Sequence, residues 1–299
     1  MPPDEAQNFR SGDAAIVGKP NAGKSTLFNA LVGARLAIVT PKPQTTRTPL
    51  LGVITRPASQ IIFWDTPGLL DPKYRLQEVM RAHAARRVRE ADLVVGLIDA
   101  HDLDASLDDD LKQILAEVRR PLIIALNKVD LVPPDALPPT VARVRETLRV
   151  EEILLISALL GRGVPDLLNA VERRLPLGPK LYDDETLTDQ PERFFVSELI
   201  REAVFERLSQ ELPYATAVSV EEFREREGKT YIRANICVER DSQKGIVIGA
   251  KARMLKGIGS GARRRIEAFL ERPVYLDLYV KVRENWRKKD ADLKDFGYV

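Results

Sequence analysis

The 299-residue sequence has little cysteine, little histidine and almost no net charge. Its single cysteine, Cys237, excludes an internal disulfide, and with only two histidines the chain has no Cys–His cluster for structural zinc. No run approaches the ~18 consecutive apolar residues of a membrane-spanning helix, which leaves peripheral membrane contact open. The net charge of +2 means that a nucleic-acid partner would need a local basic patch. This composition fits a reducing cytoplasm.

Length and composition are those of a globular protein with room for two cores, since 44% of the residues are hydrophobic and 30% are charged. Residues 1–12 carry acids and no apolar run, so we expect a flexible tail and not a signal peptide. Over residues 13–175, short apolar runs such as 14–18, 61–65 and 93–99 alternate with helical patterns. This alternation predicts an α/β domain whose mostly parallel sheet has helices on both faces.

The pattern changes after residue 175. Residues 176–192 are rich in proline and acid and lack periodicity, which indicates a linker. Residues 193–299 then show a helix, two strands, two helical stretches and a last strand at 274–282. This α-β-β-α-α-β order predicts a second, smaller α+β domain. The glycine-rich stretch 257–262 resembles a dinucleotide fingerprint, but no strand precedes it, so we interpret it as a helix break.

The stretch GKPNAGKS, residues 18–25, has two glycines, a lysine and a hydroxyl at the spacing of a phosphate-binding loop, between a predicted strand and a predicted helix. Its backbone N–H groups and the helix N-terminus would bind phosphate oxygens. Lys24 would neutralise charge on the β- and γ-phosphates, and Ser25 would offer its hydroxyl to Mg²⁺. A glycine-rich turn without a ligand is the alternative, and it is disfavoured by the strand–helix context.

Three further motifs follow in order, each at the end of an apolar run: DTPG at 65–68, NKVD at 127–130 and SAL at 157–159. The Asp65 carboxylate is expected to hold Mg²⁺ through water. Asp130 would accept both N–H donors of guanine's Watson–Crick edge. Adenine lacks this donor pair, so a site built around a buried carboxylate would reject it. Each motif alone is compatible with an ordinary turn, but their order is typical of one function.

Together the four motifs resemble the nucleotide-binding signatures of the translation-factor class of P-loop GTPases, over about residues 13–175. The run PQTTR at 43–47, the asparagine in the phosphate loop and the second domain make the chain similar to the Era family, GTPases with a C-terminal KH-type RNA-binding domain. The resemblance implies that Thr46 reaches Mg²⁺ and the γ-phosphate, with Thr45 as the alternative, and that the Gly68 N–H lies near the γ-phosphate. It assigns catalysis to Lys24, Thr46 and Gly68. Nucleotide binding is assigned to Asn21, Ala22, Gly23, Lys24, Ser25, Thr26, Asp65, Gly68, Asn127, Lys128, Asp130, Ser157, Ala158 and Leu159.

Leu69 occupies the position after the DxxG glycine, where Ras-like enzymes have a glutamine that orients water. Leucine cannot do this by hydrogen bonding, so we expect slow intrinsic hydrolysis or a substitute. Related GTPases with this replacement use a monovalent cation held partly by the phosphate-loop asparagine, here Asn21. Potassium stimulation is therefore a hypothesis, and its alternative is that Asn21 simply caps the loop.

Seven basic residues and no acid lie between Lys244 and Arg265, which favours contact with a phosphate backbone. KH domains clamp about four nucleotides over a GXXG loop. The corresponding run here begins at Gly249, and its fourth position is Ala252, which can occupy ordinary helical backbone angles but keeps a methyl group where glycine would let RNA approach more closely. A solvated helix pair is the alternative interpretation. The expected RNA-binding residues are Lys244, Ile246, Ile248, Gly249, Ala250, Lys251, Ala252, Arg253 and Lys256.

The sequence thus predicts a Mg²⁺-dependent, GTP-hydrolysing switch that binds RNA. The resemblance implies the 3′ region of small-subunit ribosomal RNA as the ligand, assembly of the small ribosomal subunit as the process, and a monomeric protein in the cytoplasm or at the inner face of the membrane. Three alternatives stay open: a P-loop kinase acting on small molecules, a GTP-gated module that recruits protein or membrane, and a GTPase for another RNA.

Overall fold

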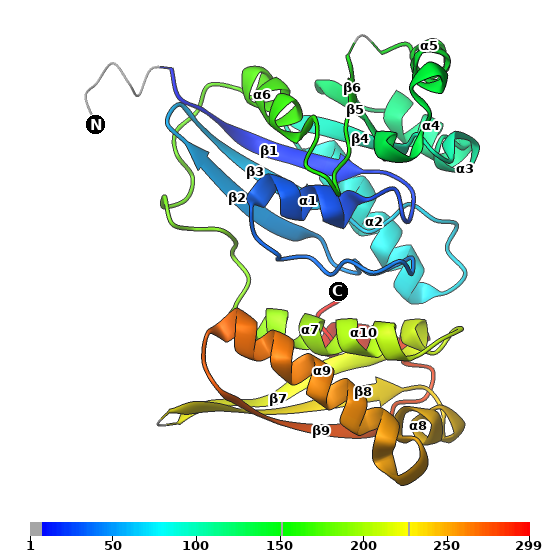
Figure 1. Cartoon of the computed structure of the whole chain (residues 1–299), viewed down its shortest axis with the longest axis vertical. Coiled ribbons are helices and arrows are strands. Elements are labelled where there is room, and N and C mark those ends of the chain that lie inside the picture. The colour runs from blue at the N-terminus through cyan, green and yellow to red at the C-terminus, as the bar shows by residue number, and fades with distance from the viewer. Residues whose placement is uncertain (1–7, 151, 227) are drawn as a thin grey trace. The chain divides into compact units, whose positions relative to one another are not determined.

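The computed structural model describes residues 8–150, 152–226 and 228–299, and these form two compact units (Figure 1). One unit contains the chain up to Ala37, Thr46–Pro72 and Met80–Asp189, and the other contains Ile38–Thr45, Lys73–Val79 and Gln190–Val299. Residues 1–7 of the expected tail lie outside the described residues. Within the described ranges, no helix combines the length and apolar character needed to cross a membrane.

A six-stranded sheet with the order β2-β3-β1-β4-β5-β6 forms the centre of the first unit. All its neighbouring strands are parallel except β2, which is antiparallel to β3. The prediction of a mostly parallel sheet is therefore confirmed, although β2 was not expected. The strands are β1 (Arg10–Val17), β2 (Leu50–Arg56), β3 (Ser59–Asp65), β4 (Leu93–Asp99), β5 (Leu122–Asn127) and β6 (Ile153–Leu155).

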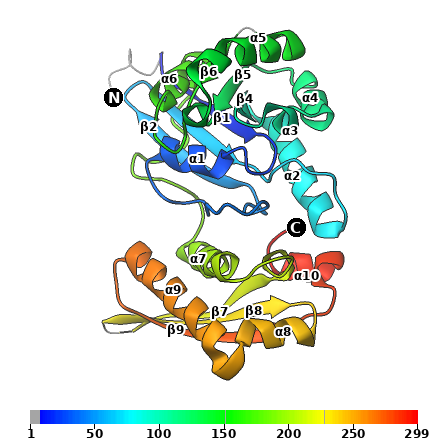
Figure 2. The same ribbon diagram turned by 45° about the vertical axis from the view of Figure 1, so that its right-hand side comes forward.

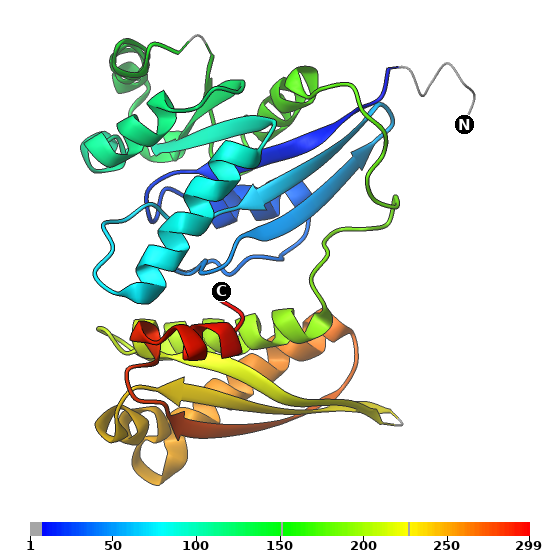
Figure 3. The same cartoon turned by 180° about the vertical axis from the view of Figure 1, so that it is seen from behind.

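Helices cover both faces of this sheet, as predicted. Figures 1 and 3 show α1 in front of the sheet in one view and α2 in front of it in the opposite view. On the α2 face, Ala84, Leu111 and Val144 of three helices share one core cluster with strand residues such as Val94. The helices are α1 (Lys24–Val32), α2 (Arg75–Glu90), α3 (Leu103–Ser106), α4 (Asp109–Ala116), α5 (Leu137–Leu148) and α6 (Val164–Arg174).

The two ends of the first unit differ from the expected boundaries. Strand β1 begins at Arg10, which pairs with Ser59, so residues 10–12 belong to the sheet and not to the tail. Part of the expected linker is held by hydrogen bonds within this unit. Gly178 N donates to Phe9 O at 3.0 Å, and the side chain of Gln60 accepts from the backbone of residues 181 and 182. The linker composition therefore marks a segment without helix or strand up to residue 191, where α7 follows from Glu192, but not one without contacts.

The second unit has a three-stranded sheet with the order β7-β8-β9, in which β8 is antiparallel to β7 and parallel to β9. The predicted α-β-β-α-α-β order is confirmed. Figure 2 shows α7 and α9 side by side against the sheet, and residues such as Ile200, Ile232 and Ile258 form their common core. The elements are α7 (Glu192–Arg207), β7 (Ala217–Arg226), β8 (Lys229–Val238), α8 (Asp241–Ile248), α9 (Arg253–Leu270), β9 (Val274–Val282) and α10 (Asp290–Asp295).

The interpretation of residues 257–262 as a helix break is wrong, because α9 runs through them without interruption. Two of its glycines, Gly257 and Gly261, lie close to α7, whereas Gly259 lies beside Leu278 of β9. A Cβ atom on Gly257 would lie 2.8 Å from Arg207 Nη1, and the buried Gly261 lies beside Ala203. Glycine costs a helix roughly 1 kcal/mol relative to alanine. Close packing of the two helices outweighs that cost here.

Candidate nucleotide-binding site and RNA-binding loop

The predicted phosphate loop joins β1 to α1 and follows the path that its residue types favour. Asn21 and Gly23 have left-handed backbone angles, with φ 63° and 98°, and α1 begins at Lys24. A Cβ atom on Gly18 would lie 2.4 Å from Leu97 O, so this position requires glycine. The loop ends on the N-terminus of α1, where unpaired N–H groups favour an anion.

Lys24 is buried inside this loop. Its ammonium group donates to Gly18 O at 3.1 Å and to Lys19 O at 2.9 Å. Burial lowers the pKa of Lys24 to about 8, while the nearby Asp65 carboxylate acts in the opposite direction. A buried cation held by two carbonyl oxygens is well placed to bind a polyanion, because the anion would supply the charge that the interior lacks.

Three predicted Mg²⁺-binding residues meet at one point, although they come from three separate segments. Ser25 Oγ donates to Asp65 Oδ2 at 2.8 Å, Thr46 Oγ1 donates to the same oxygen at 2.9 Å, and the two hydroxyls are 3.0 Å apart. It is therefore Thr46, and not the alternative Thr45, that lies beside Ser25 and Asp65.

The environment of the Asp65 carboxylate suits a bound cation. It is fully buried, and this burial raises its pKa, whereas Lys24 and the hydrogen bonds from Ser25 and Thr46 lower it. Its other oxygen, Oδ1, is buried and has no hydrogen-bond partner among the described residues. A buried acceptor beside two hydroxyls fits a hydrated Mg²⁺, which prefers oxygen ligands and keeps several of its waters.

Asn127 connects the phosphate loop to the loop that contains Ala158 through two hydrogen bonds. Its Nδ2 donates to Ala22 O at 2.8 Å, and its Oδ1 accepts from Ala158 N at 2.9 Å. The neighbouring Lys128 forms an ion pair of 2.5 Å with Asp99, a residue that we did not single out. The available signal was the position of Asp99 at the end of β4, the same strand-end position that Asp65 occupies in β3.

The predicted guanine-binding residues lie at neighbouring strand ends. Val129 N donates to Ile156 O at 3.3 Å, which places the turn that contains Asp130 beside residues 157–159. Asp130 itself is exposed, so the expectation of a buried carboxylate does not hold in this structure. Leu159 is 77% exposed and offers an apolar surface beside this loop. A bound base would therefore have to cover Asp130 for its carboxylate to become buried.

Gly68 and Leu69 lie against the phosphate loop. A Cβ atom on Gly68 would lie 3.0 Å from the backbone of Pro20, and Leu69 N donates to Gly18 O at 3.2 Å. The Leu69 side chain is fully buried in the core on the α2 face. This apolar side chain is taken up by the core, and slow intrinsic hydrolysis stays a prediction.

The candidate RNA-binding loop connects α8 to α9. Gly249 has φ 70° and ψ 170°, and both Lys251 and Ala252 have left-handed angles, with φ 50° and 58°. Ala252 thus does not use the ordinary helical angles that an alanine can occupy. Left-handed backbone angles cost an alanine roughly 1–2 kcal/mol. The ends of α8 and α9, on the two sides of the short loop, hold Ala252 in this conformation. Lys251, in the middle of this loop, is exposed.

The basic residues of this region divide into two groups. Lys251, Arg253 and Lys256 are exposed, whereas Arg265 forms ion pairs with Glu202 at 3.2 Å and Glu206 at 2.5 Å on α7. Arg265 therefore does not belong to a free basic patch. A groove between α9 and β9 is lined by the predicted Lys256, by Arg263 of the basic run, and by Gly259 and Ser260, to which the sequence pattern assigned no role. Ile246 is exposed, and Ile248 packs against the core.

Family models match both units. One, described as a 50S ribosome-binding GTPase, matches residues 13–128, and a KH-domain model matches residues 211–287. The GTPase Era of Geobacter metallireducens is 44% identical over 97% of this chain and 98% of its own length. The chain belongs to the Era family of GTPases. Hydrolysis of GTP follows from this membership, and the kinase alternative finds no support.

Further Era proteins extend the match over both units. The GTPase Era of Lacticaseibacillus paracasei is 44% identical over 96% of each chain. A solved structure of Era with MgGDPNP and nucleotides 1506-1542 of 16S ribosomal RNA has a TM-score of 0.93, with 36% identity over 97% of this chain and 99% of that chain. A variant of Aquifex aeolicus Era, bound to GDP and AlF4⁻, gives 0.92 and 35% identity, and covers 97% and 100%. Era architecture therefore accounts for the whole described chain.

Proposed function

We propose that this chain is a GTP-dependent switch that binds the 3′ region of 16S ribosomal RNA and assists assembly of the small ribosomal subunit. The observation that carries the proposal is that one unit holds the Ser25–Thr46–Asp65 cluster around a buried carboxylate, while the other holds an exposed basic loop at Lys251. A relative with the same fold, which matches 97% of this chain, has been solved with MgGDPNP and this RNA.

The proposed roles follow the geometry of the nucleotide site. The loop amides and Lys24 bind phosphates, Ser25 and Thr46 hold Mg²⁺, and Asp65 holds it through water. Mg²⁺ would neutralise charge that develops on the transferred phosphoryl group. The Gly68 N–H lies near the γ-phosphate, and Thr26 belongs to the first turn of α1. Asn127, Lys128, Asp130, Ser157, Ala158 and Leu159 surround guanine.

The name of the matching GTPase model refers to the large ribosomal subunit, whereas the proposal refers to the small one. That model ends at residue 128 and does not reach the KH domain. The RNA ligand should be decided by the RNA-binding unit, so we give the full-length Era relatives more weight than the GTPase model. A monomer in the cytoplasm, with the inner face of the membrane as a second location, remains part of the proposal.

The KH loop is tested by RNA affinity measured against salt concentration. Lys251→Gln is expected to weaken binding of a 3′-terminal 16S fragment and to lower the slope of log affinity against log salt by roughly 0.7–1, because one phosphate contact is lost. Fluorescence anisotropy of a labelled fragment measures both quantities. Lys281→Gln is the matched control, since Lys281 is an exposed lysine on β9, outside the loop and groove. Equal slopes for the two variants would contradict the assignment.

Potassium dependence tests the proposed role of Asn21. We expect hydrolysis to be several-fold faster in potassium than in sodium buffer, and the difference to vanish in Asn21→Gly. Glycine is the appropriate replacement because Asn21 has φ 63°, which alanine would adopt only with strain. Asn21→Asp keeps a side-chain oxygen and should retain part of the stimulation. Identical rates in both buffers for the wild type would leave only the loop-capping role.

A further inference from the structure

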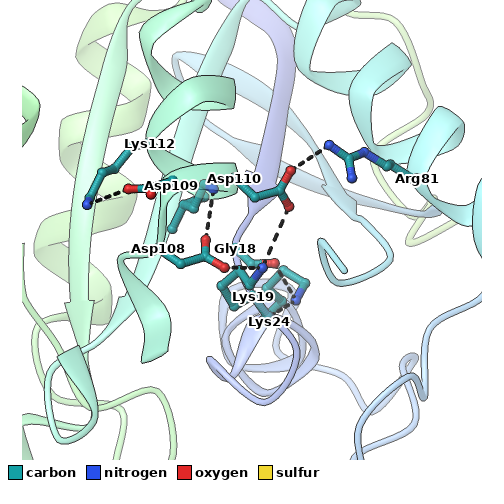
Figure 4. Close-up of polar contacts among 9 residues, drawn as sticks. Gly18, Lys19, Lys24, Arg81, Asp108, Asp109, Asp110 and Lys112 are labelled. Carbon is teal, nitrogen blue, oxygen red and sulfur yellow. Dashed lines mark hydrogen bonds and ion pairs between the residues drawn. The ribbon is translucent and has the colours of Figure 1, made fainter. Parts of the chain in front are cut away.

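A cluster of ionic side chains begins at Lys19 of the phosphate loop, and the site described above does not use its charges. We call Lys19, Asp108, Asp110 and Arg81 the bridge cluster. Lys19 Nζ lies 2.6 Å from Asp108 Oδ2 and 3.6 Å from Asp110 Oδ2, and Arg81 Nη2 lies 2.5 Å from Asp110 Oδ1 (Figure 4). Two positive and two negative groups thus form one continuous, neutral chain of contacts.

The bridge cluster connects three elements that take part in nucleotide binding or lie next to it. Lys19 belongs to the phosphate loop, between Gly18 and Lys24. Arg81 lies on α2, the helix that follows the DTPG motif. Asp108 caps the N-terminus of α4 by accepting from Leu111 N at 3.0 Å, so both acids are fixed by the start of that helix. Asp110 joins the phosphate loop to α2, because its two carboxylate oxygens face Lys19 and Arg81.

The burial of Lys19 and Asp110 separates their contact from ordinary surface ion pairs, although the side chains of Asp108 and Arg81 are 38% and 37% exposed. The side chains of Lys19 and Asp110 are 16% and 23% exposed, whereas Asp109 of the neighbouring Lys112–Asp109 pair is fully exposed. Asp110 Oδ2 is buried and has no hydrogen-bond partner within the described ranges, although Lys19 Nζ lies 3.6 Å away. A shift of less than about 1 Å would turn this ion pair into a hydrogen bond. The cluster therefore has room to tighten.

The charge of Lys19 is paired with carboxylates of α4 and of the residue that caps it. Its ammonium group meets two carboxylates, while its own carbonyl oxygen accepts from Lys24. Lys19 can therefore transmit the position of the phosphate loop to α4 and, through Asp110, to α2. This matters for hydrolysis because Leu69 supplies no polar group, so the attacking water depends on where the backbone around Gly68 is held.

We propose that Asp110 is a positioning residue for GTP hydrolysis, which fixes α2 to the phosphate loop by binding Arg81 and Lys19 at the same time. The contact acts through the backbone that precedes α2 and involves no direct contact with the nucleotide. Residues that couple two elements in this way change rates by roughly two- to thirtyfold when they are replaced. Losing the bridge should lower kcat more than it changes nucleotide affinity, because the phosphate-binding groups stay in place.

The test is a double-mutant cycle on the full-length protein. Asp110→Asn, Arg81→Gln and the double variant are compared with the wild type at saturating GTP, with GDP affinity measured in parallel. We expect each single variant to lower kcat roughly two- to thirtyfold with KM nearly unchanged, and the double variant to lose no more than the larger single loss. Arg81→Lys should restore part of kcat. Hydrogen exchange of the α2 amides should become faster in Asp110→Asn without any nucleotide.

Asp109→Asn is the matched control, because it removes the same charge one residue earlier on the same helix. It is expected to leave kcat and α2 exchange unchanged. The proposal is overturned if Asp110→Asn and Asp109→Asn behave alike, if the losses in the double variant multiply, or if kcat and GDP affinity fall together in proportion. A variant of Asp110 that failed to fold would leave the Arg81→Gln and Arg81→Lys pair to decide by the same criteria.

Discussion

The Asp130→Asn variant is expected to bind GTP roughly 10²- to 10⁴-fold more weakly than the wild type and to gain affinity for XTP. A carboxylate accepts from both the N1–H and the amino group of guanine. An asparagine side chain offers one acceptor and one donor, so it faces the guanine amino group with a donor of its own. Xanthine carries a carbonyl group at that position and restores both hydrogen bonds.

Competition of GTP, XTP and ATP against a fluorescent guanine nucleotide measures this exchange directly. Asp135→Asn is a matched control, because Asp135 is an exposed aspartate only five positions further along and its replacement removes the same charge. Because Asp130 is exposed in the structure, the experiment also tests whether its carboxylate becomes buried when nucleotide binds. If the carboxylate stayed solvated when nucleotide binds, its replacement would change affinity for GTP by less than about tenfold. That result, or unchanged discrimination, would remove Asp130 from base recognition.

Gly23→Ala is expected to lower nucleotide affinity by at least roughly 10²-fold. Gly23 has φ 98°, and a Cβ atom there would lie 2.4 Å from Asn127 Nδ2. Asn127 would have to move, and its hydrogen bonds to Ala22 O and Ala158 N would be lost together. The phosphate loop would then no longer be hydrogen-bonded through Asn127 to the loop that contains Ala158. Calorimetric titration with GDP measures the effect.

The control for this variant is Gly33→Ala at the end of α1. Gly33 also has a left-handed conformation, with φ 73°, but no atom lies within 4 Å of the position of its Cβ. It carries the backbone strain without the clash, so it should cost roughly 1–2 kcal/mol of stability and leave GDP affinity unchanged. Equal losses of affinity in both variants would show that strain, and not the displacement of Asn127, is responsible. Wild-type affinity in Gly23→Ala would contradict the geometry itself.

The elements that could be predicted from sequence are those with strong periodicity. The buried strands β3, β4 and β5 and the phosphate loop were located because continuous apolar runs and fixed motif spacing are local properties of the chain. Strand β2 was missed, since its register depends on its antiparallel partner β3. The continuity of α9 was missed for a similar reason. Gly257 and Gly261 suit a helix that packs closely against α7, which no window of sequence reveals.

The residues of the candidate site also divide into those that the sequence identifies and those that it does not. Ser25, Asp65 and Asn127 follow from motifs, and Thr46 follows from the resemblance to the Era family. The structure brings Ser25, Thr46 and Asp65 together. The strand-end position of Asp99 was a signal for its contact with Lys128. The bridge cluster could not be foreseen, because its contacts join residues 29 to 91 positions apart that belong to no common pattern (110 − 81 and 110 − 19). The left-handed angles of Ala252 were likewise hidden, since its residue type favours other conformations.

Crosslinking of the full-length chain to RNA in cells, followed by sequencing of the attached RNA, tests the central claim most directly. The account predicts that the crosslinks concentrate at the 3′ end of 16S ribosomal RNA, and that Lys251→Gln reduces them while Lys281→Gln does not. Crosslinks concentrated in messenger, transfer or large-subunit ribosomal RNA would contradict the proposed ligand and process.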